Sequence, residues 1–171
     1  MDNDKKIYVY IYEPDLCEFF IDEGVVNNNT DELLKFVSKV KKENDKVYGY
    51  FCFRVSFDTE YENPFFIEFD SDCELDFSYI SSVLTMLNSR EDLYEYIENS
   101  NFKYRYLNGK DEILIASKDE KLYLVNFNDE PDDSGQLVCN LFEKDRNPMV
   151  FSKKLISSYS IYELKTFLEA L

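Results

Sequence analysis

Eight carboxylates and no lysine or arginine lie between residues 58 and 76 of the chain. Their charges amount to half of the formal net charge of −16. Side chains of this kind at this density can bind a hard divalent cation, steer a basic partner into a complex, or keep one face of a sheet in water. The eight residues are Asp58, Glu60, Glu62, Glu68, Asp70, Asp72, Glu74 and Asp76.

The metal-binding interpretation has one supporting feature and two against it. Asp70 and Asp72 have the spacing of the first two ligands in a calcium-binding loop, but the sixth position is Leu75 instead of Gly and the twelfth is Ser81 instead of Glu. In an extended strand, carboxylates two residues apart point in parallel and lie ~6.8 Å apart, twice the ~3.4 Å rise per residue. We therefore predict no metal ion and no cofactor, with a carboxylate-dependent metalloenzyme as the alternative.

The chain contains no histidine, which removes the usual general base near neutral pH and the usual activator of a Ser or Cys nucleophile. Four glycines leave no phosphate-binding loop, and no two of the four cysteines have zinc-knuckle spacing. A catalytic thiol at Cys17 or Cys139 would lack an activating base. These absences predict that the protein is not an enzyme.

A docking role for the acidic segment is the main alternative to a purely solvated face. A second acidic run, expected in a loop, offers Asp129, Glu130, Asp132 and Asp133. We expect the strand acids to matter more, because a strand holds its charges at fixed spacing while a loop loses entropy to do so. Tyrosines on the polar faces of two strands are either second-layer core or a recognition surface. The secondary interface candidates among them are Tyr8, Tyr10, Tyr48 and Tyr50.

These side chains are placed by strands of period two and helices of period 3.6. The pattern predicts an α+β fold, mainly antiparallel, with about four helices on one face of the sheet and the order β-β-α-β-β-α-α-β-β-β-β-α. Asn108-Gly109 is a strong hairpin signal, and Ser160 with Glu163 forms a capping box. Expected strands cover residues 7–12, 16–21, 47–58, 65–72, 102–107, 112–117, 121–127 and 136–142; helices are expected to begin at Thr30, at Asp76 or Ser78, at Ser89 and at Ser160.

We expect residues 1–171 to form a single α+β domain, with two lobes divided near residue 100 as the weaker alternative. No apolar run approaches the ~20 residues of a membrane span. The first six residues lack the apolar core of a signal peptide. A net charge of −16 repels phosphates, so direct binding of nucleic acid is not expected. The predicted location is the cytoplasm, and the oligomeric state is left open.

The combined features lead to a functional hypothesis. We expect an acidic protein-binding inhibitor or antidote that occludes a basic surface of a partner such as a nuclease. In size and acidity alone the chain is similar to bacterial immunity proteins and to phage-encoded inhibitors of host defence nucleases. The alternatives are the carboxylate-dependent metalloenzyme and an acidic adaptor subunit of a larger assembly.

Overall fold

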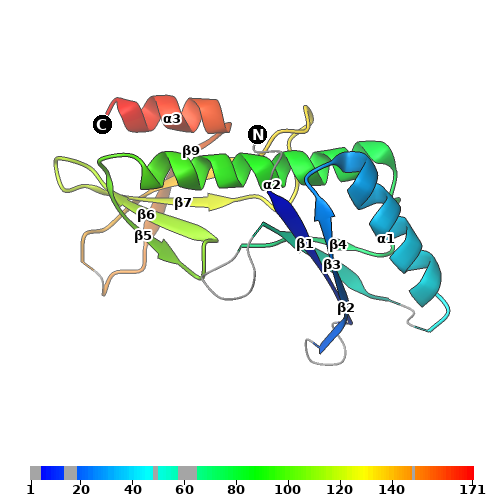
Figure 1. The fold of residues 1–171 in the computed structure, drawn as a ribbon. Coiled ribbons are helices and arrows are strands. Elements are labelled where there is room, and N and C mark those ends of the chain that lie inside the picture. The colour runs from blue at the N-terminus through cyan, green and yellow to red at the C-terminus, as the bar shows by residue number, and fades with distance from the viewer. Residues whose placement is uncertain (1–4, 14–18, 48–49, 58–64, 148) are drawn as a thin grey trace. The chain divides into compact units, whose positions relative to one another are not determined.

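A computed structural model describes residues 5–13, 19–47, 50–57, 65–147 and 149–171 (Figure 1). Within these residues the protein is an α+β fold with two antiparallel sheets and three helices. The chain divides into two compact units, Met1–Leu87 and Asn88–Leu171, which are described separately below. Whether they behave as one domain stays a prediction.

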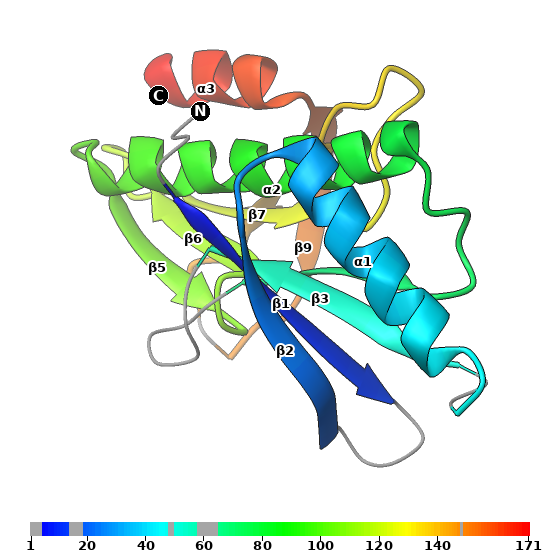
Figure 2. The same ribbon diagram turned by 45° about the vertical axis from the view of Figure 1, so that its right-hand side comes forward.

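The first unit contains a four-stranded sheet, sheet A, with strand order β2-β1-β3-β4. One face, the inner face, carries fully buried Ile7, Val9 and Ile11 of β1, as the period-two pattern predicts. Phe36 of helix α1 packs on Gly24, where a Cβ atom would approach the Phe36 ring to 2.4 Å. Figure 2 shows α1 beside the strands of this sheet. The elements are β1 (Lys6–Glu13), β2 (Phe19–Asn27), α1 (Thr30–Asn44), β3 (Cys52–Ser56) and β4 (Ile67–Asp70).

The N-cap of helix α1 lies one residue earlier than the sequence suggested. The side chain of Asn29, not that of Thr30, is the N-cap and accepts a hydrogen bond from the Glu32 backbone N–H at 3.2 Å. Asparagine is at least as good a cap as threonine. The helical spacing predicts a buried stripe of Leu33, Phe36, Val37 and Val40; Phe36 is half-buried and the other three are buried.

Helix α2 (Phe77–Glu98) is one continuous helix of 22 residues, so the prediction of two helices with a new start at Ser89 is wrong. The sequence from Phe77 to Glu98 contains no Gly or Pro to interrupt the backbone hydrogen bonds. A capping-box sequence is compatible with a helix interior, and Arg90 is buried there. The predicted cap Asp76 is observed, since its carboxylate accepts from the Tyr79 N–H at 2.8 Å.

The second unit contains a five-stranded meander, sheet B, with strand order β5-β6-β7-β8-β9. The predicted Asn108-Gly109 turn is confirmed, with φ of 54° and 70°. The last strand was not predicted, because its sequence does not alternate and a bulge shifts its register next to Leu141. The elements are β5 (Lys103–Leu107), β6 (Glu112–Ala116), β7 (Leu122–Phe127), β8 (Cys139–Lys144), β9 (Lys153–Tyr159) and helix α3 (Ile161–Glu169).

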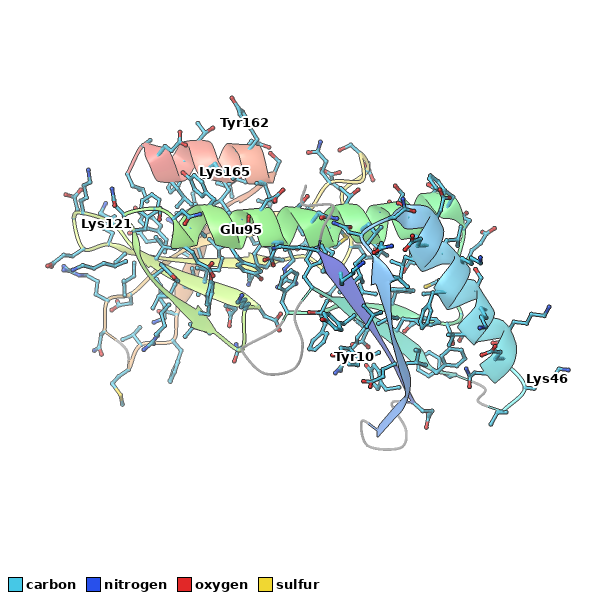
Figure 3. All side chains as sticks on the ribbon, in the orientation of Figure 1. Tyr10, Lys46, Glu95, Lys121, Tyr162 and Lys165 are labelled. Atoms are coloured by element: carbon cyan, nitrogen blue, oxygen red, sulfur yellow. The ribbon has the colours of Figure 1, made fainter. Side chains whose placement is uncertain are left out.

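Helix α3 starts with the predicted capping box of Ser160 and Glu163. Leu164 and Leu168 are fully buried. Phe167, which the helical spacing predicts on the same buried stripe, is half-buried. The opposite side of the helix is in solvent, where Tyr162 is 80% exposed and points away from the sheet (Figure 3).

Candidate functional site

The acidic segment is only partly within the described residues. Asp58, Glu60 and Glu62 lie outside them, and so does Tyr48. Glu68 and Asp70 are in β4, on the face of sheet A opposite the inner face, which we call the outer face of sheet A. The remaining three acids follow β4 in a segment that we call the acidic turn (residues 70–76).

Glu68 is engaged by two side chains of its own sheet. Its carboxylate accepts hydrogen bonds from the Tyr12 hydroxyl at 2.5 Å and from Arg54 Nε at 3.2 Å. The Arg54 guanidinium also lies 4.2 Å from the centre of the Tyr12 ring. Burial and the hydrogen bond to Glu68 raise the pKa of Tyr12 above its ordinary value. The charge of Glu68 is therefore largely compensated within the sheet.

Asp70 is engaged as well. Its carboxylate accepts from the Tyr50 hydroxyl at 2.8 Å and from the Cys52 thiol at 3.3 Å. Burial raises the pKa of the Cys52 thiol to about 11, and the hydrogen bond to Asp70 adds to the increase. The thiol is thus protonated at neutral pH, which makes it a hydrogen-bond donor and a poor nucleophile.

The backbone of the acidic turn is fixed through Ser71, which is 2% exposed. The Ser71 N–H donates to the Phe51 carbonyl at 2.9 Å, and the Phe51 N–H donates to Ser71 Oγ at 3.2 Å. Lys41 of α1 donates to the Ser71 carbonyl at 2.7 Å. At the other end, Asp76 is held as the cap of α2. The turn is therefore anchored at both ends.

Asp72 and Glu74 are the two acids of this turn that remain available. Both side chains are exposed, and in the described part of the chain neither has a hydrogen-bond or ion-pair partner. Glu74 also lines a hollow of about 380 Å³ together with Lys41 and Lys42 of α1. The hollow next to α1 therefore has side chains of both charges, whereas the electrostatic potential at Asp72 is negative.

The second acidic run is an ordered turn. One carboxylate oxygen of Asp132 accepts from the Ser134 N–H at 2.9 Å, the Ser134 hydroxyl at 2.7 Å and the Gln136 N–H at 2.9 Å. These hydrogen bonds, that from Gln136 first, hold the pKa of the Asp132 carboxyl below its usual value. Asp129, Glu130 and Asp133 are exposed around it. Asp132 therefore orders this loop, while the expected greater importance of the strand acids stays a prediction.

The described tyrosine candidates differ in their access to solvent. Tyr10, labelled in Figure 3, belongs to β1. It is 4% exposed and packs edge-on against Phe66, with ring centres 5.9 Å apart. Tyr8 is half-buried, and Tyr50 is 36% exposed while it donates to Asp70. An interface through these tyrosines stays a prediction, with Tyr50 the most accessible member.

Two arginines that organise these regions were not singled out from the sequence. Arg54 stands alone on the polar face of an alternating strand, and its cross-strand neighbour is Glu68. A cation facing the acidic strand in the predicted hairpin was the signal that could have identified it. Arg90 donates to the Tyr94 hydroxyl at 2.6 Å and lies 4.4 Å from the Phe127 ring centre. No sequence signal distinguishes it from a surface arginine of a helix.

The described side chains give no group of three or more His, Cys, Asp or Glu that could share a metal ion. Among the described helices, none combines the length and apolar character needed to cross a membrane. Comparisons with protein-family models, with characterised proteins and with solved structures found no match. The functional argument therefore depends on the chain's own geometry and charge.

Proposed function

We propose that this protein is a protein-binding inhibitor or antidote that covers a basic surface of a partner, such as the nucleic-acid channel of a nuclease. The observation that supports this most is the acidic turn, whose anchored backbone presents Asp72 and Glu74 to solvent. The ordered turn around Asp132 gives the second unit a similar surface.

Anchoring matters because binding is weakened by the entropy lost when side chains and loops become ordered. The hydrogen bonds of Ser71 have already fixed the turn before any partner arrives. A net charge of −16 adds long-range attraction for a basic partner and raises the association rate. The unengaged carboxylates then supply short-range pairs for Lys or Arg of the partner.

The structure changes which acids we expect to contribute. Glu68 and Asp70 would have to give up their contacts with Arg54 and Tyr50 before they could bind a partner. Asp72, Glu74, Asp129, Glu130 and Asp133 need no such exchange. We therefore rank the turn acids above the strand acids, the reverse of the order that the sequence suggested.

A carboxylate-dependent metalloenzyme is the competing hypothesis. Mg²⁺ and Ca²⁺ sites take several oxygen ligands around one ion. The carboxylate oxygens of Glu68 and Asp70 already accept hydrogen bonds from tyrosine, arginine and thiol donors. The two residues also stand at alternate positions of one strand, so their carboxylates point in parallel instead of converging on one ion. The geometry thus favours docking over metal chemistry.

The test begins with affinity capture from the native host and identification of the partner by mass spectrometry. Association rates are then measured for the purified pair at low and physiological salt. The double variant Asp72→Asn with Glu74→Gln should slow association about tenfold, and added salt should reduce the difference. The control Glu43→Gln with Asp119→Asn removes the same charge from exposed positions elsewhere. Equal rates for both variants and the natural protein would overturn the proposal.

A further inference from the structure

Helices α2 and α3 contact one face of sheet B. The described ring contacts of these helices do not involve the other face. Tyr123 and Tyr159 contact Phe167 of α3, with ring centres 5.7 and 6.1 Å apart, and Phe127 contacts Tyr94 of α2 at 6.2 Å. Tyr123 and Phe127 are four residues apart on β7, so they point to the same side. Tyr159 points to that side too, because it lies opposite Cys139, which is itself opposite Phe127. We call the opposite side the outer face of sheet B.

The register places like residues in rows across the outer face. One row, which we call the basic row, has lysines at three of its five positions, and the row beside it, the apolar row, is apolar at four of its five. A third row of amides and a hydroxyl is held by hydrogen bonds from Asn140 to Asn126 at 3.0 Å and from Ser158 to Asn140 at 2.7 Å. The basic row is Lys103, Ala116, Leu122, Lys144 and Lys153; the apolar row is Arg105, Leu114, Leu124, Phe142 and Leu155.

The charge of this face is opposite to that of the whole chain. Lys103 and Arg105 are exposed and, within the described residues, have no ion-pair partner. Lys153 lies 4.4 Å from the Phe142 ring centre and 3.9 Å from the Glu112 carboxylate, so its stem covers part of the apolar row. A cationic face in a protein of net charge −16 needs an explanation other than solubility.

The apolar row is incompletely covered. In this row Leu155 is 52% exposed and Leu124 is 4% exposed; in the segment before β9, Phe151 is 86% and Met149 is 79% exposed. Exposed apolar side chains gathered in one segment, with polar residues around them, are typical of a protein interface. The outer face thus combines the half-exposed Leu155 with a cationic border, and the segment before β9 adds exposed apolar residues to the same part of the chain.

A hollow of about 620 Å³ opens at the end of the basic row. Lys103 and Lys118 line it, together with Arg146, which pairs with Glu120. Leu122 and Leu168 supply apolar walls. Glu169 also lines the hollow, so an acidic side chain of a bound segment would find its cationic partners there at Lys103 and Lys118.

We propose that the outer face of sheet B docks an amphipathic helix of a partner protein, with the helix's acidic flank along the basic row. Five strands ~4.8 Å apart span ~19 Å. A helix rising 1.5 Å per residue covers that length with about 13 residues, or three to four turns. The inference belongs to the second unit alone and does not depend on the proposed function.

Two alternatives fit the face less well. Addition of a strand at β9 is opposed by the bulge beside Leu141 and by the lysines at positions 153 and 154, devices that protect sheet edges. A nucleic acid would need an open ring for stacking, but Lys153 covers Phe142, and the net charge repels a polyanion at long range.

The experiment uses two fluorescent helical peptides of about 13 residues with the same leucine stripe, one flanked by Glu and the other by Lys. Binding to the full chain is followed by fluorescence anisotropy, and amide shifts in NMR spectra locate it. We expect the Glu peptide to bind and to shift Leu114, Phe142 and Leu155. Lys103→Gln with Arg105→Gln should weaken it about tenfold, and Leu155→Gln by a similar factor. Lys42→Gln with Lys46→Gln removes the same charge from α1 and its end, and should change affinity less than about twofold.

Several results would overturn the inference. The first is that the Glu peptide does not bind at about 1 mM. The second is that the outer-face variants and the control bind it with equal affinity. The third is that its amide shifts are confined to the acidic turn. Tight binding of an oligothymidylate at the same residues would assign the face to nucleic acid instead. Self-association in sedimentation that Leu155→Gln abolishes would assign it to a second copy of this chain. Binding of the Lys peptide at the acidic turn, lost in Asp72→Asn with Glu74→Gln, would support the proposed function. Failure of the Glu peptide to bind would overturn only the inference about sheet B.

Discussion

On the outer face of sheet A, opposite groups meet: Arg54 contacts Glu68 and Tyr12, and Asp70 contacts Tyr50 and Cys52. On the outer face of sheet B, three lysines share one row across the strands, and the row beside it is apolar except for Arg105. Both sheets are antiparallel meanders or near-meanders with helices on the inner side, so topology does not cause the difference. Cross-strand pairing causes it, because the partner opposite each residue decides whether its charge is neutralised locally or left for another molecule.

The largest expected effect separates the two faces of sheet B. Leu164→Ala opens a cavity under α3 and should lower the free energy of unfolding by about 2–5 kcal/mol. Leu155→Gln, on the outer face, should change it by less than about 0.5 kcal/mol, since the side chain is already half in solvent. Urea unfolding followed by circular dichroism measures both. A large loss from Leu155→Gln would show that the outer face belongs to the core of the fold.

The next prediction concerns alkaline pH and compares one thiol from each sheet. Burial raises the pKa of Cys52 to about 11 and that of Cys139 to about 12, from an ordinary value of 9.0. Each thiol then contributes stability that is complete below pH 9 and is lost as the pH rises through the folded value. Stability should therefore fall above pH 9. Cys139→Ala should make that fall shallower, and Cys73→Ala controls for the loss of a thiol. An unchanged slope in Cys139→Ala would contradict the assignment.

Motifs of a few neighbouring residues predicted the fold correctly more often than inferences that depend on contacts between distant residues. Asn108-Gly109 and the Ser160 capping box are set by neighbouring residues, and both are confirmed. The predicted break at Ser89 is wrong, because a capping sequence cannot end a helix that tertiary packing around Arg90 continues. Strand β9 was missed, because pairing with β8 rather than its own alternation makes it a strand.

The candidate site shows the same limit. The high frequency of Asp and Glu between residues 58 and 76 identified the acidic segment. The sequence did not show that Asp72 and Glu74 lie on a turn, because that depends on where β4 ends, at Asp70. That Glu68 and Asp70 are engaged depends on the register of β3 against β4 and on Tyr12 of β1. A sequence pattern gives the facing direction of a side chain but not the identity of its cross-strand neighbour.

A smaller effect tests the pairing on sheet A directly. Arg54 and Glu68 are partly exposed, so solvent screens their attraction. A double-mutant cycle of Arg54→Gln and Glu68→Gln should give a coupling of about 1 kcal/mol that decreases with salt. On sheet B, Lys103→Gln with Arg105→Gln should change stability by less than about 0.3 kcal/mol. A coupling near zero on sheet A would remove the contrast between the two outer faces.

The smallest expected effect on stability comes from the acidic turn, and its small size is informative. Asp72 and Glu74 make no described contact that folding needs, while the surrounding charge of −16 repels them. Asp72→Asn with Glu74→Gln should therefore leave stability unchanged or raise it by a few tenths of a kcal/mol, about the size of a surface charge effect. Thermal unfolding at low and high salt measures the change, and Glu43→Gln with Asp119→Asn is the matched control.

The same turn variant separates the two roles open to these acids. If they only keep the protein dispersed, the variant will bind a basic partner at the natural rate but aggregate at lower concentration in light scattering. If they dock a partner, it will stay dispersed and associate slowly. A loss of stability above about 1 kcal/mol would mean that the carboxylates hold the turn together. The hydrogen bonds of Ser71 and the Asp76 cap argue against that outcome, because they fix both ends of the turn without either side chain.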